Sequence, residues 1–191
     1  HVRITMFDAA PDGSAAPNAD EVRAGLASEI DDVERAGYST EAQFLRLELA
    51  ISARDVDDVI AHVGAFDAID DDPWVPQRLP SSALARMHLL DLPDDKALVL
   101  AEKLSHPGRT PVDHAWRNGA AHAILAAHAT LASPPPWCAQ IYAPLEPAPM
   151  WTRSWLAWRA ACYRAVDDKS APSARRIAKA QADYDALVAH E

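Results

Sequence analysis

Histidines offer the first possible chemistry, because a neutral imidazole is a common metal ligand. His114, His122 and His128 lie in one stretch with helical character. At about 100° per residue, their side chains would fall within an arc of about 120°. Two ligands of one ion need a spacing of three or four residues on a helix, which these three lack. We therefore predict no tightly bound transition metal and no cofactor.

Two carboxylate–histidine pairs do have a spacing of four residues, which places both side chains on one helix face. They are Asp58 with His62 and Glu102 with His106. Neither pair belongs to an HExxH or ExxH motif, so a shared metal is only an alternative here. We interpret these histidines as ordinary side chains on alanine-rich helices.

Pairs of aspartates recur along the chain and suggest a second chemistry, the binding of Mg²⁺ with pyrophosphate. Such a site needs two acidic motifs facing each other across a large helical cavity, which a chain of 191 residues would struggle to enclose. Asp57-Asp58 and Asp94-Asp95 fit the first turn of a helix better, because the helix dipole favours negative charge there. We interpret these two pairs as capping groups. The full set is Asp31-Asp32, Asp57-Asp58, Asp70 to Asp72, Asp94-Asp95 and Asp167-Asp168.

Tryptophans form a stripe at helical spacing near the carboxyl end. The stripe consists of Trp151, Trp155, Trp158 and Cys162. Such a stripe usually packs into a core, which is the interpretation we favour. The alternative is a partner-binding hot spot, because Arg153 and Arg159 are interleaved and Trp and Arg dominate such sites. The chain contains no P-loop, GxGxxG motif, nucleophile elbow or Cys–His catalytic context.

Composition excludes several partners. The formal net charge of −10 argues against nucleic acid and anionic membranes, but it permits a basic protein or peptide partner. No apolar run approaches the roughly 20 residues that span a bilayer, so we expect no membrane segment and a cytoplasmic location. Cys138 and Cys162 lack metal-knuckle or CxxC spacing, so we expect two reduced thiols, with a single disulfide as the alternative. Because residue 1 is His1, we expect a processed or shortened chain.

Proline placement predicts an all-α fold. None of the 15 prolines needs to lie inside a helix, where each would cost about 3 kcal/mol. We predict seven or eight helices packed as antiparallel hairpins, with no sheet of three or more strands. Residues 1–18 are expected to be an extended or flexible lead-in. Residues 19–191 are expected to form one helical domain with proline-rich loops at 70–80 and 133–149.

Two segments resemble each other, Leu45 to Phe66 and Ala83 to Leu104, with an offset of 38 residues. Each predicts a helix, an acidic turn and a second helix, which is an αα-hairpin that needs a stacked neighbour. The second segment resembles a degenerate tetratricopeptide repeat of the sort found in bacterial regulators. Ala160 and Tyr163 resemble the small and aromatic pair of that repeat's first helix. The resemblance implies a scaffold that binds other proteins, and it does not imply catalysis.

Two hypotheses for function follow. The first is a non-enzymatic protein-interaction module, such as an adaptor, a chaperone, an immunity-type protein or the sensor domain of a regulator. The alternative is a small helical enzyme or ligand-binding protein, with its site between the helix 111–132 and the loop 133–149. In stacked hairpins the first helix of each pair lines the concave surface, so its polar residues would contact a partner. The residues predicted to bind are Arg86, His88, His114, Arg117, Asn118, Arg153 and Arg159.

Overall fold

Helices stand side by side in a long row. The computed structural model describes residues 19–68, 92–106, 111–146, 148–166 and 170–190. Within these ranges the chain is all-α and has no strand, as predicted. The α-helices are α1 (Ala19–Arg35), α2 (Ser39–Ala53), α3 (Val56–Ala68), α5 (Asp94–Ser105), α6 (Pro111–His128), α7 (Ala139–Tyr142), α8 (Arg153–Ala165) and α9 (Ala171–Val188).

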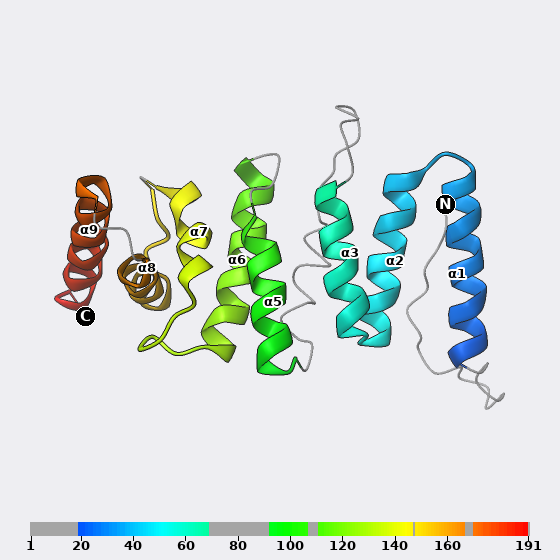
Figure 1. Ribbon diagram of the computed structural model, residues 1–191, viewed down its shortest axis with the longest axis horizontal. Helices are drawn as coiled ribbons and strands as arrows, with labels where there is room; N and C mark the ends of the chain where they lie inside the picture. The colour runs from blue at the N-terminus through cyan, green and yellow to red at the C-terminus, as the bar shows by residue number, and fades with distance from the viewer. Residues whose placement is uncertain (1–18, 69–91, 107–110, 147, 167–169, 191) are drawn as a thin grey trace.

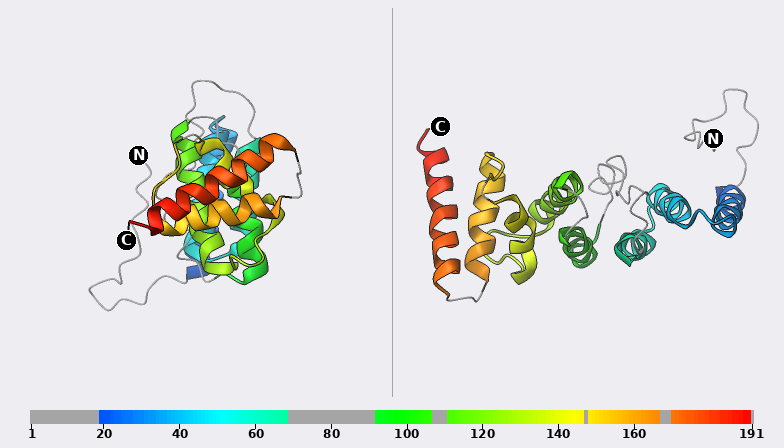
Figure 2. Two further views of the ribbon diagram at one scale, coloured as in Figure 1. Left: turned by 90° about the vertical axis from the view of Figure 1, so that its left-hand side faces the viewer. Right: turned by 90° about the horizontal axis from the view of Figure 1, so that it is seen from above.

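Neighbours in sequence are neighbours in space. Packing joins α1 to α2, α2 to α3, α3 to α5, α5 to α6 and α8 to α9. Figure 1 shows α1 and α9 at opposite ends of the row, and Figure 2 shows the same arrangement from its end and from above. Each helix therefore buries its apolar face mainly against the next one along the chain, as expected for stacked hairpins.

Backbone rules set the helix boundaries. Gly37 follows α1 with a φ of +95°, a conformation that glycine adopts without a steric penalty. Pro111 begins α6, and Pro172 lies in the first turn of α9, where the missing N–H breaks no helical bond. No proline occurs in the interior of any helix that the structure describes. The proline argument for the fold is therefore confirmed for these residues.

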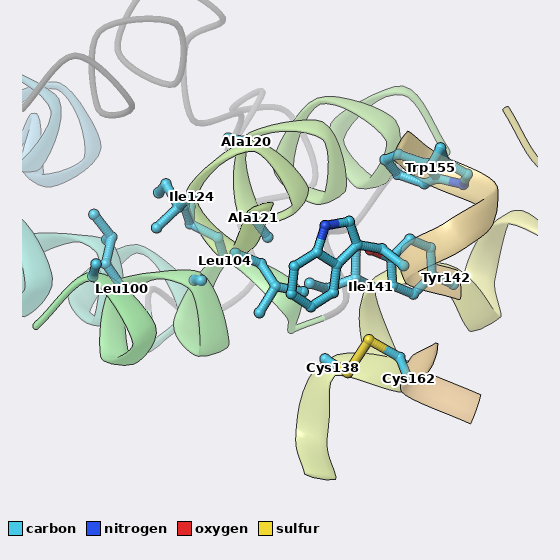
Figure 3. Close-up of a cluster of buried hydrophobic side chains, with 14 of the residues drawn as sticks. Leu100, Leu104, Ala120, Ala121, Ile124, Cys138, Ile141, Tyr142, Trp155 and Cys162 are labelled. Carbon is cyan, nitrogen blue, oxygen red and sulfur yellow. A yellow bond between two sulfur atoms is a disulfide. The ribbon is translucent and has the colours of Figure 1, made fainter. Parts of the chain in front are cut away.

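The core runs continuously through the middle of the row. Leu100 and Leu104 of α5 and Ile124 of α6 are almost completely buried, and small residues such as Ala121 let the helices approach closely. Figure 3 shows these side chains meeting Ile141, Tyr142 and Trp155 in one cluster. Truncation of such a leucine to alanine costs about 2–5 kcal/mol, so each of these side chains contributes substantially to the stability of the row.

The segment 133–149, expected to be a loop, contains short helical turns. A 3₁₀ turn at Pro136–Cys138 leads into α7, and a second 3₁₀ turn follows at Ala143–Leu145. Proline lies in the first turn of both 3₁₀ elements, where its fixed φ is compatible with helical geometry. The six prolines of this segment therefore prevent a long helix but are compatible with short helical turns.

A disulfide joins this segment to α8. The sulfur atoms of Cys138 and Cys162 are 2.01 Å apart, and both residues are fully buried. The prediction of two reduced thiols was therefore wrong. The cysteines are separated by 24 residues, and the short turns after Pro135 bring Cys138 against α8. That approach depends on tertiary packing, which cysteine spacing does not reveal.

Part of the predicted repeat can be located. Leu45 to Phe66 spans α2 and α3, which form a hairpin joined at Arg54 and Asp55. The second copy includes α5, but residues 83–91 lie outside the described ranges, so superposition of the two hairpins stays a prediction. The lead-in 1–18 and the loop 70–80 also lie outside them. No described helix is long and apolar enough to cross a membrane.

The disulfide should contribute substantially to stability. In the chain-entropy model, closing a loop of this length stabilises the folded state by about 3 kcal/mol. We expect the double variant Cys138→Ala/Cys162→Ala to lose roughly that much free energy of unfolding in urea titration. Wild-type protein unfolded in the presence of a reductant serves as the control and should match the variant. Equal stability with and without the covalent bond would contradict this.

Candidate functional site

A chain of three polar side chains links α6, α7 and α8. His122 on α6 lies between the hydroxyl groups of Tyr142 on α7 and Ser154 on α8. Its Nδ1 is 2.9 Å from Tyr142 Oη, and its Nε2 is 3.3 Å from Ser154 Oγ. We call this arrangement the His122 chain. It lies where the alternative hypothesis placed a site, between the helix 111–132 and the segment that follows it.

Aromatic packing holds the His122 chain in place. The ring centroid of Trp155 is 4.6 Å from that of His122 and 5.0 Å from that of Tyr142. Figure 3 shows Tyr142 and Trp155 next to each other, and their rings meet edge to face with an interplanar angle of 76°. Burial lowers the pKa of His122 from 6.5 to about 4 and raises the pKa of Tyr142 above its ordinary value. Both groups are therefore neutral at neutral pH.

The direction of the protons follows from the burial of Tyr142. The Tyr142 hydroxyl is almost completely buried, and within the described ranges only His122 is within hydrogen-bond reach of it. A buried O–H without an acceptor costs about 1–3 kcal/mol, so this hydroxyl donates to Nδ1 of His122. The proton of the neutral ring is then on Nε2, which donates to Ser154 Oγ.

This proton arrangement decides what the His122 chain can do. A catalytic serine needs a neighbouring base with a free acceptor nitrogen, but Nε2 of His122 carries a hydrogen here. A pKa near 4 also makes the imidazole a weak base at neutral pH. The exposed Ser154 hydroxyl accepts from His122, so its own hydrogen does not point to the ring and can donate to another group. The geometry suits binding better than nucleophilic catalysis.

The tryptophan stripe is mostly core. Trp155, Trp158 and Cys162 are buried, which confirms the favoured interpretation for these three residues. Trp151 is different, because it precedes α8 and is 57% exposed. Thr152 caps the first turn of α8, because its Oγ1 accepts a hydrogen bond from the backbone N–H of Trp155 at 3.3 Å.

Two of the predicted binding residues, Arg117 and Arg159, are buried. The Arg117 guanidinium donates to the backbone carbonyls of Lys103 and Leu104, which crosslinks α6 to the end of α5. Arg153 is exposed at the start of α8. The side chain of His114 is not described, and Arg86 and His88 lie outside the described ranges. The structure therefore does not test the seven residues as one surface.

Asn118, also predicted to bind, is fully buried on α6. Within the described part of the chain, neither its amide nitrogen nor its oxygen has a hydrogen-bond partner, and the same holds for Trp155 Nε1. Unpaired buried polar groups cost free energy, so these atoms are the least favourable feature of this part of the core.

Arg159 is the centre of a buried ionic network. Its Nε is 2.6 Å from Glu146 Oε1, and its Nη1 is 2.7 Å from Asp183 Oδ2. Tyr163 also donates to Glu146, and Lys179 pairs with Asp183 at 2.7 Å. Although burial opposes it, the hydrogen bonds from Lys179 and Arg159 hold the pKa of Asp183 below its ordinary value. One guanidinium thus ties the segment before α8 to both α8 and α9.

The histidines His62 and His128 do not share a site. His62 Nδ1 is 3.3 Å from Gln43 Oε1, and His128 Nδ1 is 2.9 Å from Asp94 Oδ1. The described residues contain no group of three or more His, Cys, Asp or Glu side chains placed to hold a metal. Asp57-Asp58 and Asp94-Asp95 lie in the first turns of α3 and α5, as the capping interpretation predicted.

Comparisons with family models, with curated proteins and with solved structures found no match. The resemblance to tetratricopeptide repeats therefore depends on the quoted residues and on the packing of neighbouring helices. The His122 chain was not predicted as a set of residues. Its members are far apart in sequence, and only the expected contact between α6 and the following segment pointed to this place.

Titration of His122 should be visible in the pH dependence of stability. The folded pKa lies below the unfolded value, so the neutral ring contributes stability above about pH 6.5 that is lost as the pH falls toward 4. We expect a loss of roughly 2–3 kcal/mol over this range, since each pKa unit corresponds to about 1.4 kcal/mol.

The measurement is urea unfolding at several pH values for wild type and His122→Gln. Glutamine does not titrate, yet it can accept from Tyr142 and donate to Ser154. His122→Gln should therefore flatten the dependence, whereas His128→Gln, at the far end of α6, should keep it. A wild-type slope in His122→Gln would exclude this role of the ring.

The structural role of Arg159 can be separated from a binding role. Arg159→Met should lower the free energy of unfolding by about 3 kcal/mol, because it leaves Glu146 and Asp183 half-buried without their main cation. Arg153→Met, on the exposed start of the same helix, should change it by less than about 0.5 kcal/mol. Thermal and urea unfolding measure both. An unaffected Arg159→Met protein would show that the network is not stabilising.

Proposed function

We propose that this chain is a protein-binding module that uses one uncharged face in the middle of its helical row. Of the seven large apolar side chains exposed in the described part of the chain, four lie between residues 116 and 151. They are Trp116, Leu131, Met150 and Trp151, and we call them the apolar face. Their concentration in this stretch of the sequence is the observation that carries the proposal, because exposed apolar surface that gathers in one part of a protein marks interaction sites.

The stretch of sequence that carries the apolar face contains few charged residues. From Trp116 to Thr152 only Arg117 and Glu146 carry a charge. Arg117 is buried, and Glu146 is bound to Arg159. The rest of the chain is strongly charged, so the contrast is local. Depletion of charge together with exposed Trp and Met is typical of the centre of a protein–protein interface.

The exposed side of α6 adds a smooth surface beside the tryptophans. Ala123, Ala126 and Ala127 are exposed there. Gly119 lies on the same helix, and nothing is within 4 Å of the position where a Cβ would be. A partner's backbone could therefore approach α6 closely. Such access suits a protein segment better than a compact small molecule, which needs a concave site.

Polar donors lie at the edge of the apolar face and favour a partner with acceptors. Arg153 and Ser154 are exposed at the start of α8, immediately after Trp151. Because the Ser154 hydroxyl accepts from His122 in the proton arrangement argued above, its own hydrogen can donate to another group. The favoured partner is a segment with an apolar or aromatic residue beside carbonyl or carboxylate oxygens, which an acidic peptide would supply.

The biological setting is part of the proposal. The tetratricopeptide resemblance supports an adaptor, chaperone, immunity-type or regulatory role without choosing among them. The buried disulfide favours an oxidising compartment over the cytoplasm expected from the sequence, because cytosolic thiols are kept reduced. The alternative, a small enzyme at the His122 chain, is disfavoured by the proton on Nε2 and by the low pKa of the ring.

The apolar face can be tested with matched variants. The double variant Trp116→Ser/Trp151→Ser should no longer bind a partner that the wild-type protein binds. A tryptophan buried in an interface contributes about 2 kcal/mol or more to the binding free energy, which is roughly 30-fold in affinity. Tyr38→Ser/Val188→Ser removes exposed apolar groups elsewhere and should capture the same partner normally. Titration of the purified pair by calorimetry gives the affinities. Equal binding by both double variants would refute the proposal.

A further inference from the structure

We infer that the Cys138–Cys162 disulfide is a one-way latch for the site around His122. Oxidation of the two thiols sets the geometry of this site, and burial then protects the bond from reductants. The consequence for binding rests on the proposed function, because the latched segment supplies Tyr142 to the His122 chain beside the apolar face. The latch itself does not depend on any partner.

The latched segment meets α8 through three residues at a regular spacing. Cys138, Tyr142 and Glu146 recur at every fourth position, and α7 with its two flanking 3₁₀ turns connects them. Residues four apart lie on one side of a helical stretch, so all three can face α8 together. Their respective partners on α8 are Cys162, Trp155 and Arg159. Figure 3 shows the disulfide between the segment and α8.

Only the first of these three contacts is covalent. The ring centroids of Tyr142 and Trp155 are 5.0 Å apart, and Glu146 pairs with Arg159 at 2.6 Å. Each of these two contacts has to compensate for the entropy lost when the segment is ordered. The disulfide joins positions separated by 24 residues and therefore removes part of that entropy in advance. Loss of the disulfide should weaken both of the other contacts.

Closure of the latch is a thiol–disulfide exchange, in which a small-molecule or protein disulfide is the oxidant. The thiolate of one cysteine attacks the oxidant and releases one thiol, which leaves a mixed disulfide. The thiolate of the other cysteine then displaces the second thiol, and the Cys138–Cys162 bond forms. The two cysteines lose two electrons and two protons in total, and the oxidant takes up both as two thiols. Oxidising compartments supply such oxidants.

Burial makes the closed latch difficult to reverse. Reduction needs a thiolate to reach one of the two sulfur atoms, and the rate of exchange depends on that access. Cys138 and Cys162 are fully buried, and they belong to the core cluster that also contains Ile141 and Trp158. A reductant can therefore attack only after the segment has opened or the chain has unfolded. Once formed, the site would keep its geometry in a reducing environment.

The state of the latch should be visible at His122. Nδ1 of its ring is 2.9 Å from Tyr142 Oη, and burial lowers the pKa of the imidazole to about 4. Its printed contacts are with Tyr142, Trp155 and Ser154, and all three are uncharged at neutral pH. Release of the segment would move Tyr142 away and let water reach the ring. The pKa of His122 would then rise toward the ordinary value of 6.5.

Proton NMR titration of the purified full chain tests the effect of the latch on the site. The pKa of His122 should be higher in Cys138→Ala/Cys162→Ala than in oxidised wild type by at least about one unit, roughly tenfold in proton affinity. His122→Gln identifies the resonance. His128, at the far end of α6 and bound to Asp94, is the matched control and should follow the same curve in both proteins. An unchanged His122, or a His128 that changes with it, would overturn a local latch.

The rate of reduction tests the protection by burial. Dithiothreitol is added to oxidised wild type at about pH 8, where thiols are partly ionised, and the released thiols are alkylated and counted by mass spectrometry. The native protein should be reduced at least about 100-fold more slowly than the same protein in urea. Equal rates would show that the disulfide is accessible and would overturn the one-way latch. Neither measurement needs a partner, so failure of the proposed function would leave both results unchanged.

Discussion

The segment between α6 and α8 is held in place mainly by links to α8, and the features of the middle of the row depend on those links. The disulfide fixes Cys138 against Cys162, and the Arg159 guanidinium binds Glu146 near the other end of the same segment. Between these two anchors, Tyr142 is placed beside His122. Broken by prolines, the segment has only short helical turns and could not hold this geometry through its own hydrogen bonds.

The two anchors also explain how an exposed apolar face can persist. In sequence, Leu131 precedes Cys138 by seven residues, and Met150 and Trp151 follow Glu146 by four and five residues, so the anchors lie between Leu131 and the other two. In a loose segment these side chains would turn inward to escape water, because burial of each is worth about 1.5–3 kcal/mol. Covalent and ionic attachment to α8 removes that freedom. Exposure of the apolar face thus depends on the disulfide and on the Arg159–Glu146 ion pair.

The positions of proline and glycine and the helical spacing of apolar residues predict the helices from the sequence. Helical spacing also bears on whether a side chain is buried, as Arg159 shows. Pro111 and Gly37 mark boundaries that the structure keeps. Arg159 lies four residues after Trp155 and three before Cys162, so the spacing that buries the stripe buries the arginine too. Its positive charge suggested a surface contact, whereas its position indicated the core. Position is the better guide when a long polar side chain can find partners inside.

Contacts between residues far apart in the sequence could not be predicted, and the His122 chain shows why. Its three residues come from three helices, and no spacing rule connects His122 with Ser154. Their meeting depends on how the anchored segment turns, which in turn depends on Cys138 and Glu146. In the His122 chain all three side chains are neutral. The direction of each hydrogen bond is set by Tyr142, because its buried hydroxyl must donate to an acceptor. Since neither Tyr142 nor His122 is charged near neutral pH, the Ser154 hydroxyl keeps its role as acceptor from His122 across that range. A partner that binds beside Trp151 would therefore meet the same pattern of donors whatever the local pH between about 6 and 8.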